Sequence, residues 1–158
     1  MRPSRAGRGE GERGGAVSLE FGIFDGFSAQ DTEREASAVY EDHIGRAQRA
    51  ERVGFRYYFF IEHQSSPIAY ISAPSVYLAA LARETSALRF GPMVYQLPMH
   101  NPMRLAQDAA MVDHLSHGRL EFGIGYGIHE HEFLRWKMPF SERREMGIDG
   151  SYVVPFQW

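Results

Sequence analysis

Four short segments with the composition of β-strands recur along the chain at a nearly regular interval. Each is aromatic or β-branched and is bounded by Gly or Pro, which is typical of strands. Their first residues lie about 31 to 37 positions apart. The segments are residues 19–24, 56–61, 88–95 and 119–124. A chain with this spacing has room for a helix between each strand and the next.

A helical pattern fills the first interval, over residues 32–53. The sequence from Thr32 to Glu35 fits a capping box, in which two side chains satisfy free N–H groups at a helix start. Gly54 suits the position just past a helix end. The apolar residues at helical spacing, which predict the buried face, are Ala36, Tyr40, Ile44, Ala47 and Ala50.

Two further helical patterns begin with a proline, a residue that suits the first turn of a helix. One spans residues 73–84 with Pro74 in its first turn. The other spans residues 102–116 and ends before Gly118. The predicted buried positions are Val76, Tyr77, Ala80 and Leu81 in the first helix and Leu105, Ala109, Val112 and Leu115 in the second.

This alternation of strands and helices predicts βα units and a parallel sheet. Four units of about 32 residues are visible, and eight would total about 256 residues, close to the typical size of a (β/α)8 TIM barrel. We therefore predict an α/β chain in which residues 19–145 form about the first four βα units of such a barrel. A four-stranded open sheet is the alternative that the pattern alone leaves.

Both ends of the chain depart from this rhythm. Residues 1–18 hold five Gly and four Arg with little apolar surface, so we expect a disordered leader, with RNA binding by a basic tail as the alternative. An over-extended translation start would explain such a leader. Residues 129–145 can begin another helix. We interpret residues 146–158 as an atypical tail, as from a frameshift or a premature stop, against a natural short C-terminus.

The composition excludes several classes of function. The chain has no Cys, which rules out disulfides, thiolate catalysis and Cys-ligated zinc. Its 17 basic and 20 acidic residues give a formal net charge of -3, so we expect neither nucleic acid nor an anionic membrane as a partner. No apolar stretch is long enough to span a membrane, and the basic N-terminus lacks the apolar segment of a secretory signal. We expect a cytoplasmic protein.

The residues Glu62, His63 and Gln64 follow the second predicted strand. In a TIM barrel the active site lies at the carboxyl ends of the strands. An imidazole at this position can transfer a proton near neutral pH, which makes His63 a candidate catalytic residue. The alternative is a strand-end histidine whose hydrogen bonds are satisfied by neighbouring backbone.

A glycine-rich segment, residues 123–127 (GIGYG), follows the fourth predicted strand. Glycine there lets a ligand approach the backbone, although the spacing is not that of the dinucleotide-binding fingerprint, and a tight turn without a ligand is the alternative. The next tract, residues 129–132 (HEHE), has alternate histidines, but the sequence places no third ligand, so we expect no metal site. His100, in a loop with two prolines, is expected to be solvated.

Four segments together resemble the bacterial luciferase-like flavin-dependent monooxygenases. They are residues 19–27 (LEFGIFDGF), 54–64 (GFRYYFFIEHQ), 72–82 (SAPSVYLAALA) and 88–127, which ends in the run DHLSHGRLEFGIGYG. The resemblance covers residues 19–145. It implies a (β/α)8 barrel, of which this chain carries the N-terminal half, in agreement with the rhythm of strands and helices.

The resemblance also implies a site and a cofactor. His63 matches the family's active-site histidine beside the flavin, where it would assist proton transfer, and Glu62 would orient it or form a hydrogen bond with it. The family pattern often has a second histidine where this chain has Gln64. The cofactor implied is reduced FMN, used with oxygen on a small organic substrate, with a deazaflavin as the alternative.

Two more cofactor contacts follow from the resemblance. A non-prolyl cis peptide would fall near Met93 and Val94, which would lie against the flavin ring, whereas plain barrel lining is the alternative. Gly125 and Tyr126 would lie on the flavin phosphate side. Many family members have Arg where this chain has Tyr126, and a tyrosine offers only a hydroxyl or a stacking face.

The resemblance and the length together suggest two readings of the function. The first is a flavin-dependent monooxygenase, served by a flavin reductase. The second is a non-catalytic half-barrel remnant, or a partner subunit, without flavin turnover. Half a barrel would leave an open sheet edge that a second copy can cover, so we expect a homo-oligomer.

Overall fold

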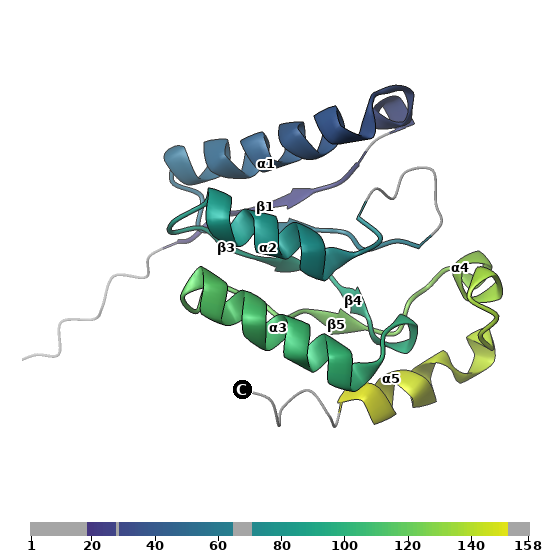
Figure 1. Ribbon diagram of the computed structural model, residues 1–158. Coiled ribbons are helices and arrows are strands. Elements are labelled where there is room, and N and C mark those ends of the chain that lie inside the picture. The colour runs from purple at the N-terminus through teal and green to yellow at the C-terminus, as the bar shows by residue number, and fades with distance from the viewer. Residues whose placement is uncertain (1–18, 28, 65–70, 152–158) are drawn as a thin grey trace, which may run out of the picture.

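The computed structural model describes residues 19–27, 29–64 and 71–151, so the predictions for residues 1–18 and 152–158 lie outside the described residues. The described residues form five strands, and all the pairings among these strands are parallel (Figure 1). They are β1 (Gly22–Asp25), β2 (Tyr57–Phe60), β3 (Arg89–Pro92), β4 (Tyr95–Gln96) and β5 (Ile124–Gly125). The first three form one sheet in the order β1-β2-β3, and β4 pairs with β5. The predicted parallel α/β arrangement is confirmed.

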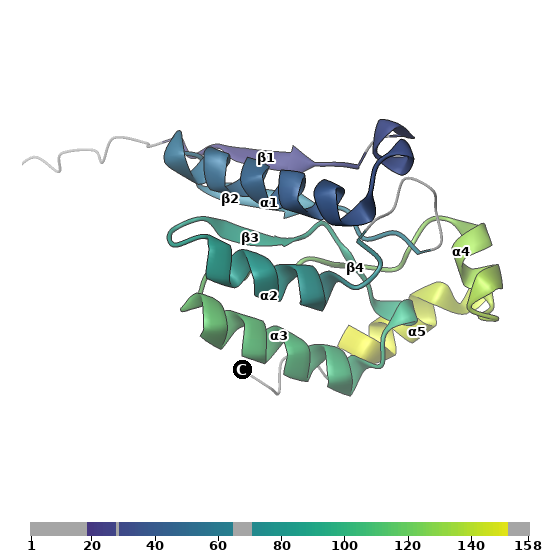
Figure 2. The ribbon, with the colours of Figure 1, turned by 45° about the horizontal axis from the view of Figure 1, so that its top comes forward.

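The helices between the strands cover one side of the sheet (Figure 2). They are α1 (Ala36–Arg52), α2 (Pro74–Glu84) and α3 (Pro102–Ser116). Two shorter helices, α4 (Glu130–Arg135) and α5 (Arg143–Ser151), follow β5. The 3-10 helices are η1 (Ala29–Glu33), η2 (Leu97–Met99) and η3 (Phe140–Glu142). Among the helices of the described residues, none is both long and apolar enough to cross a membrane.

The third and fourth predicted strands are each interrupted. Residues 88–95 divide into β3 and β4, and the interruption falls at Met93 and Val94, which are joined by a cis peptide bond. The resemblance had placed such a bond at this point. In the fourth segment, Leu120 forms an isolated parallel bridge to Phe90, and regular pairing resumes only at β5. The βα order is therefore as predicted, but the strands are shorter.

The predicted start of the first helix is wrong. α1 begins at Ala36, and the capping-box residues fall in and after η1, where the Arg34 N–H donates to the carbonyl oxygen of Asp31. Glu35 occupies the N-cap position of α1 without a side-chain hydrogen bond. By contrast, α3 has a real cap, because the Asn101 side chain accepts from the Arg104 N–H at 3.1 Å and Pro102 follows it.

Four residues predicted to be buried are exposed instead, and one of them is Ala36 at the start of α1. Tyr40, Val76 and Leu115 are 36%, 73% and 42% exposed. On α1 the buried face runs through Val39 and His43, because His43 binds a buried carboxylate and so takes a place that an apolar pattern would not assign to it. The other predicted core positions of these helices are buried or half-buried.

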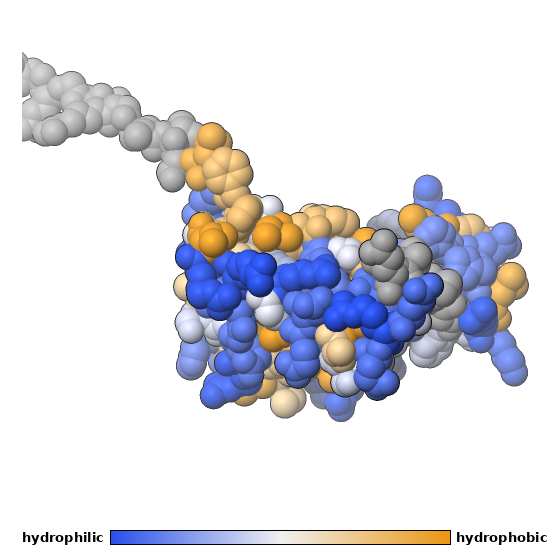
Figure 3. Space-filling model, turned by 90° about the horizontal axis from the view of Figure 1, so that it is seen from above, coloured by the Kyte–Doolittle hydropathy of each residue, from blue (hydrophilic) through white to orange (hydrophobic). Residues whose placement is uncertain are grey.

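The core lies between the helices and the helix-facing side of the sheet. Along β2, Tyr58 and Phe60 are buried against this layer, while the alternate residues Tyr57 and Phe59 on the opposite side are only half-buried. Leu78 and Leu81 of α2 complete the centre of the cluster. Figure 3 looks down on the side of the molecule that carries α1. Hydrophilic side chains cover much of this surface, and hydrophobic ones gather along the edge from which the N-terminal segment leaves.

The guanidinium group of Arg119 joins the ends of α2 and α3 to the start of β3. It donates to the carbonyl oxygens of Ala82, Thr85, Leu88 and Ser116 and to the hydroxyl of Thr85, at 2.6 to 3.0 Å. Burial lowers the pKa of this guanidinium, but its usual value is so high that it stays charged. One cation thereby satisfies carbonyl groups that two helix ends leave free.

We expect Arg119→Met to destabilise the fold by about 3 kcal/mol or more, because it leaves several buried carbonyl groups without a donor. Urea unfolding followed by circular dichroism measures the loss. The control is Arg104→Met, which removes an exposed ion pair with Asp108 on α3 and should change stability by about 0.5 kcal/mol at most. Equal unfolding midpoints for the two variants would contradict this role of Arg119.

Asp25, at the end of β1, is a second buried polar centre. Burial alone would raise the pKa of this carboxyl, but hydrogen bonds from His43 (2.6 Å) and from the Tyr58 hydroxyl, with the charge of Arg46, lower it overall. A carboxyl whose pKa is lowered on folding stabilises the protein above its unfolded pKa of about 4, and this stabilisation is lost as the pH falls through the folded value.

We therefore expect Asp25→Asn to flatten the dependence of stability on pH below about pH 5. The measurement is the free energy of unfolding in urea at a series of pH values from neutral to acidic. At neutral pH the variant should be less stable than the parent, and the two curves should approach each other as the pH falls. Parallel curves over the whole range would show that Asp25 does not contribute in this way.

Candidate active site

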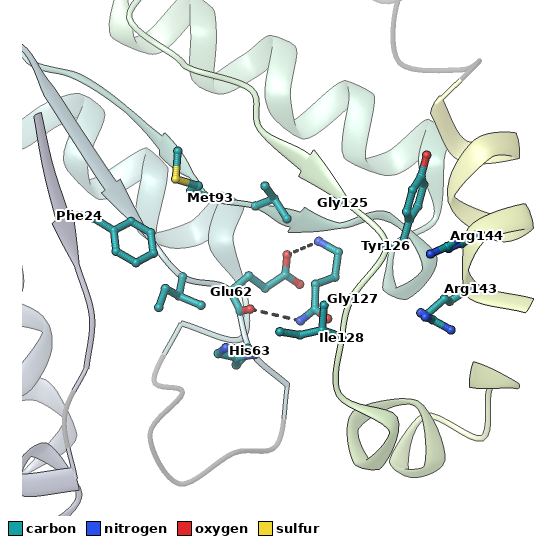
Figure 4. Close-up of a pocket in the computed structure, with 13 residues that line it drawn as sticks. Phe24, Glu62, His63, Met93, Gly125, Tyr126, Gly127, Ile128, Arg143 and Arg144 are labelled. Atoms are coloured by element: carbon teal, nitrogen blue, oxygen red, sulfur yellow. Dashed lines mark hydrogen bonds between the residues drawn. The ribbon is translucent and has the colours of Figure 1, made fainter. Parts of the chain in front are cut away.

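A pocket of about 460 Å³ lies at the carboxyl ends of the strands (Figure 4). We call it the strand-end pocket. It contains every site residue that the sequence predicted, namely Glu62, His63, Met93, Val94, Gly125 and Tyr126. Gly127, from the predicted glycine-rich segment, also lines it. The remaining lining residues were missed: Phe24, Ile61, Gln96, Ile128, Arg143 and Arg144. Residues far apart in the sequence therefore meet where a barrel would place its active site.

Glu62 is buried at one wall of this pocket and is surrounded by hydrogen-bond donors. Its carboxylate accepts from the Gln64 side chain at 2.8 Å, from the Gln96 backbone N–H at 2.9 Å and from His100 at 2.8 Å. The Gln96 side chain in turn donates to the Glu62 carbonyl oxygen at 3.2 Å (Figure 4). Glu62 thus holds the end of β2 against β4 and η2.

Two predictions about this region are corrected. Glu62 does not orient His63, because its side chain faces Gln64 and His100. His100 is not a solvated loop residue, since η2 turns the chain so that its imidazole reaches Glu62, with only 20% of the side chain exposed. The ring of His100 also packs edge-on against Tyr95, with the centroids 5.5 Å apart.

The partner of His63 is Glu132. The Nδ1 atom of His63 lies 3.0 Å from Oε1 of Glu132, and the same oxygen accepts the Gln64 backbone N–H at 3.0 Å. Glu132 comes from α4 and is fully buried, whereas 19% of the His63 side chain is exposed and the residue lines the pocket. A side-chain carboxylate, rather than neighbouring backbone, therefore satisfies this strand-end histidine.

Glu132 belongs to residues 129–132, the tract with alternate histidines. Within residues 19–27, 29–64 and 71–151, no three metal-ligating side chains converge. The tract instead begins α4, which buries Glu132 and Phe133 and leaves Glu130 and His131 exposed. The side of the helix on which each residue falls therefore distinguishes the buried glutamate from the exposed one.

Two glycines in and next to β5 allow close packing within the protein. A Cβ atom on Gly123 would lie 2.6 Å from the carbonyl oxygen of Pro92, and one on Gly125 would lie 2.5 Å from a methyl group of Val94. These two glycines let β5 approach the segment that holds the cis peptide bond. The half-exposed Met93 side chain remains open to the pocket.

The far wall of the pocket comes from α5, whose Arg143 and Arg144 line it beside Tyr126 (Figure 4). Arg143 is fixed, because its guanidinium lies 3.9 Å from the centre of the Phe140 ring and donates to the Phe140 carbonyl oxygen at 3.0 Å. α5 continues to Ser151, so the boundary placed after residue 145 falls inside a helix rather than at the start of an irregular tail.

Comparison with known proteins identifies the family. The family described as luciferase-like monooxygenase matches residues 19–149. The uncharacterized protein y4wF of Sinorhizobium fredii is 40% identical over 110 residues, which cover 69% of this chain and 31% of the relative. The oxygenase component of the flavin-dependent trigonelline monooxygenase of Acinetobacter baylyi is 29% identical over 117 residues, which cover 74% of this chain and 32% of the relative.

Solved structures agree. Monooxygenase RslO1 from Streptomyces bottropensis superposes with a TM-score of 0.81 at 28% identity, over 86% of this chain and 42% of that one. The oxygenating constituent of 3,6-diketocamphane monooxygenase from Pseudomonas putida, in complex with FMN, shares the fold with a TM-score of 0.77 at 23% identity, over 87% and 38% of the two chains.

The chain spans only about a third of the length of the curated relatives that it matches. What it matches is the N-terminal portion of TIM-barrel structures, as the spacing of its strands predicts. With the family match over residues 19–149, this shows that the chain belongs to the luciferase-like monooxygenase family.

Proposed function

We propose that the protein acts as a flavin-dependent monooxygenase, which uses reduced FMN and molecular oxygen to oxidise a small organic substrate. The observation that carries this proposal is the convergence of three features on one pocket: a histidine held by a buried carboxylate, an apolar wall and a pair of arginines. The family membership supports the same reaction class.

The residues of the strand-end pocket fit a flavin. Its volume lies within the range of small-molecule sites, about 300 to 1,000 Å³. Phe24, Met93 and Ile128 present exposed apolar surface that a planar ring system would cover. Gln96 adds a buried Oε1 atom that has no hydrogen-bond partner among the described residues and is free to accept from a ring N–H.

The two arginines suit the phosphate end of FMN. Guanidinium groups bind phosphate by charge-assisted hydrogen bonds, which are stronger than neutral ones. Arg144 is exposed at the pocket, and no ion pair engages it within the described parts of the chain. These arginines would supply the charge that Tyr126 lacks. In Figure 4 they lie on the opposite side of the pocket from Phe24 and Met93, which would contact the ring.

Reduced flavin supplies the electrons that activate oxygen, and the protein supplies position and proton handling. With Nδ1 engaged by Glu132, the Nε2 atom of His63 is the one available for proton transfer in the pocket. The apolar wall would cover the bound ring and so shield it from water on that side. A separate flavin reductase would deliver the reduced flavin, as the description of the Acinetobacter relative as an oxygenase component suggests.

We expect His63→Ala to leave FMN binding nearly unchanged and to slow the reoxidation of bound reduced FMN by oxygen about 100-fold, because general acid–base catalysis contributes about 10²- to 10⁴-fold. Stopped-flow absorbance and the release of hydrogen peroxide measure this rate without an added substrate. The control is His114→Ala, an exposed histidine on α3 outside the pocket. If both variants match the parent, His63 has no such role.

A second test concerns the phosphate. We expect Arg144→Ala to weaken FMN binding about tenfold, or about 1.4 kcal/mol, and to leave riboflavin binding unchanged, because riboflavin has no phosphate. Fluorescence titration of both flavins measures the two affinities, and Arg135→Ala on the exposed side of α4 is the matched control.

The same titration separates the remaining alternatives. Equal weakening of FMN and riboflavin by Arg144→Ala would remove Arg144 from the phosphate site. Tighter binding of a deazaflavin than of FMN by the parent chain would favour the alternative cofactor. If the parent chain bound neither cofactor saturably, the enzyme proposal would be wrong, and a half barrel without flavin turnover would be the better description.

A further inference from the structure

We propose that Glu132 is a positioning residue that holds His63 in a single tautomer, with the proton on Nδ1 and an unprotonated Nε2 directed to the pocket. The catalytic use of that Nε2 atom rests on the proposed function. The tautomer itself rests only on the geometry of the two side chains and can be tested without any flavin.

The geometry shows why Nδ1 should carry the proton. The Glu132 side chain is fully buried, and its Oε1 atom receives two contacts, from His63 Nδ1 and from the Gln64 backbone N–H, both at 3.0 Å. Its Oε2 atom is buried without a partner among the described residues. Because a buried carboxylate is costly unless donors surround it, an unprotonated Nδ1 facing this oxygen would remove one of its two donors.

The consequence for His63 follows from the chemistry of imidazole. In a neutral ring one nitrogen donates and the other accepts, and the hydrogen bond of one nitrogen decides the role of the other. With Nδ1 donating to Glu132, Nε2 is a proton acceptor, which is the role of a general base. His129, whose ring centroid lies 5.0 Å from that of His63, packs beside the imidazole and helps to fix its plane.

A purely structural role for Glu132 is the competing explanation. In that case the carboxylate only fastens α4 to the end of β2 through the Gln64 N–H, and His63 is free to adopt either tautomer. The two explanations differ in what happens to the ring nitrogens when the negative charge is removed and the shape of the side chain is kept, as in Glu132→Gln.

The test is nitrogen-15 NMR of histidine-labelled protein at about pH 8, in which long-range proton–nitrogen correlations distinguish protonated from unprotonated ring nitrogens. The His63 signals among the seven histidines are assigned by their loss in His63→Ala. We expect the parent to show a protonated Nδ1 and a bare Nε2. Glu132→Gln should populate the other tautomer, while the exposed Glu130→Gln on the same helix should not.

Activity gives a second readout. We expect Glu132→Gln to slow reoxidation of bound reduced FMN about tenfold, with an FMN affinity within about twofold of the parent. Carboxylates that orient metal-binding histidines typically contribute about 10- to 100-fold, and we take the lower end for a histidine without a metal. Combined with His63→Ala, the Glu132→Gln change should add nothing, since both changes act through one imidazole.

The outcomes separate this inference from the proposed function. A parent spectrum with the proton on Nε2, or a tautomer that Glu132→Gln leaves unchanged, overturns the positioning role even if His63→Ala slows reoxidation. Absence of flavin binding refutes the proposed function but leaves the tautomer result standing. Once His63→Ala has assigned the His63 signals, the parent spectrum decides the tautomer, so this result does not depend on the folding of Glu132→Gln.

Discussion

A buried carboxylate at the end of β2 is the constraint on which the pocket depends. Glu62 cannot remain unpaired in the interior, because an uncompensated buried charge costs several kcal/mol. Its donors come from its own strand end, from the backbone of β4 and from the residue after η2. Folding must therefore bring these three segments to one point, and that point is a wall of the strand-end pocket.

Two other buried carboxylates are also paired, and all three have a histidine as a partner. Asp25 binds His43 behind β1, Glu62 binds His100, and Glu132 binds His63. The exposure of the histidine distinguishes a pair that only stabilises the fold from one that could take part in a reaction. His43 is buried under the ring of Phe27, whereas His63 is partly exposed and lines the strand-end pocket. One kind of interaction thus stabilises the fold in one place and, on our proposal, prepares a proton-transfer group in another.

The order of the elements was predictable because it depends on local signals. Proline and glycine mark where helices begin and end, and periodic apolar residues mark their buried faces. The predictions failed where a long-range polar contact overrides that pattern. The buried face of α1 runs through His43 rather than Tyr40 because Asp25, far away in the sequence, supplies a partner.

In the candidate site, too, the features set by local sequence were predictable and the long-range contacts were not. Its six predicted residues all line the pocket, since strand ends meet in a barrel whatever their separation in sequence. Their partners were not predictable: Glu62 lies 38 positions from His100, and His63 lies 69 positions from Glu132, so no local pattern connects them. Arg143 and Arg144 were missed because nothing in the sequence shows that α5 packs against η2 and beside Tyr126.

The central claim is that FMN occupies the strand-end pocket, and methionine methyl NMR tests it most directly. The chain has seven methionines. Met93 is 50% exposed in the pocket, and Met111, which is 63% exposed, lies outside it on α3. Titration with FMN should shift the Met93 methyl signal saturably and leave that of Met111 in place. A Met93 signal that stays fixed while FMN binds, or that moves only in step with Met111, would contradict the claim.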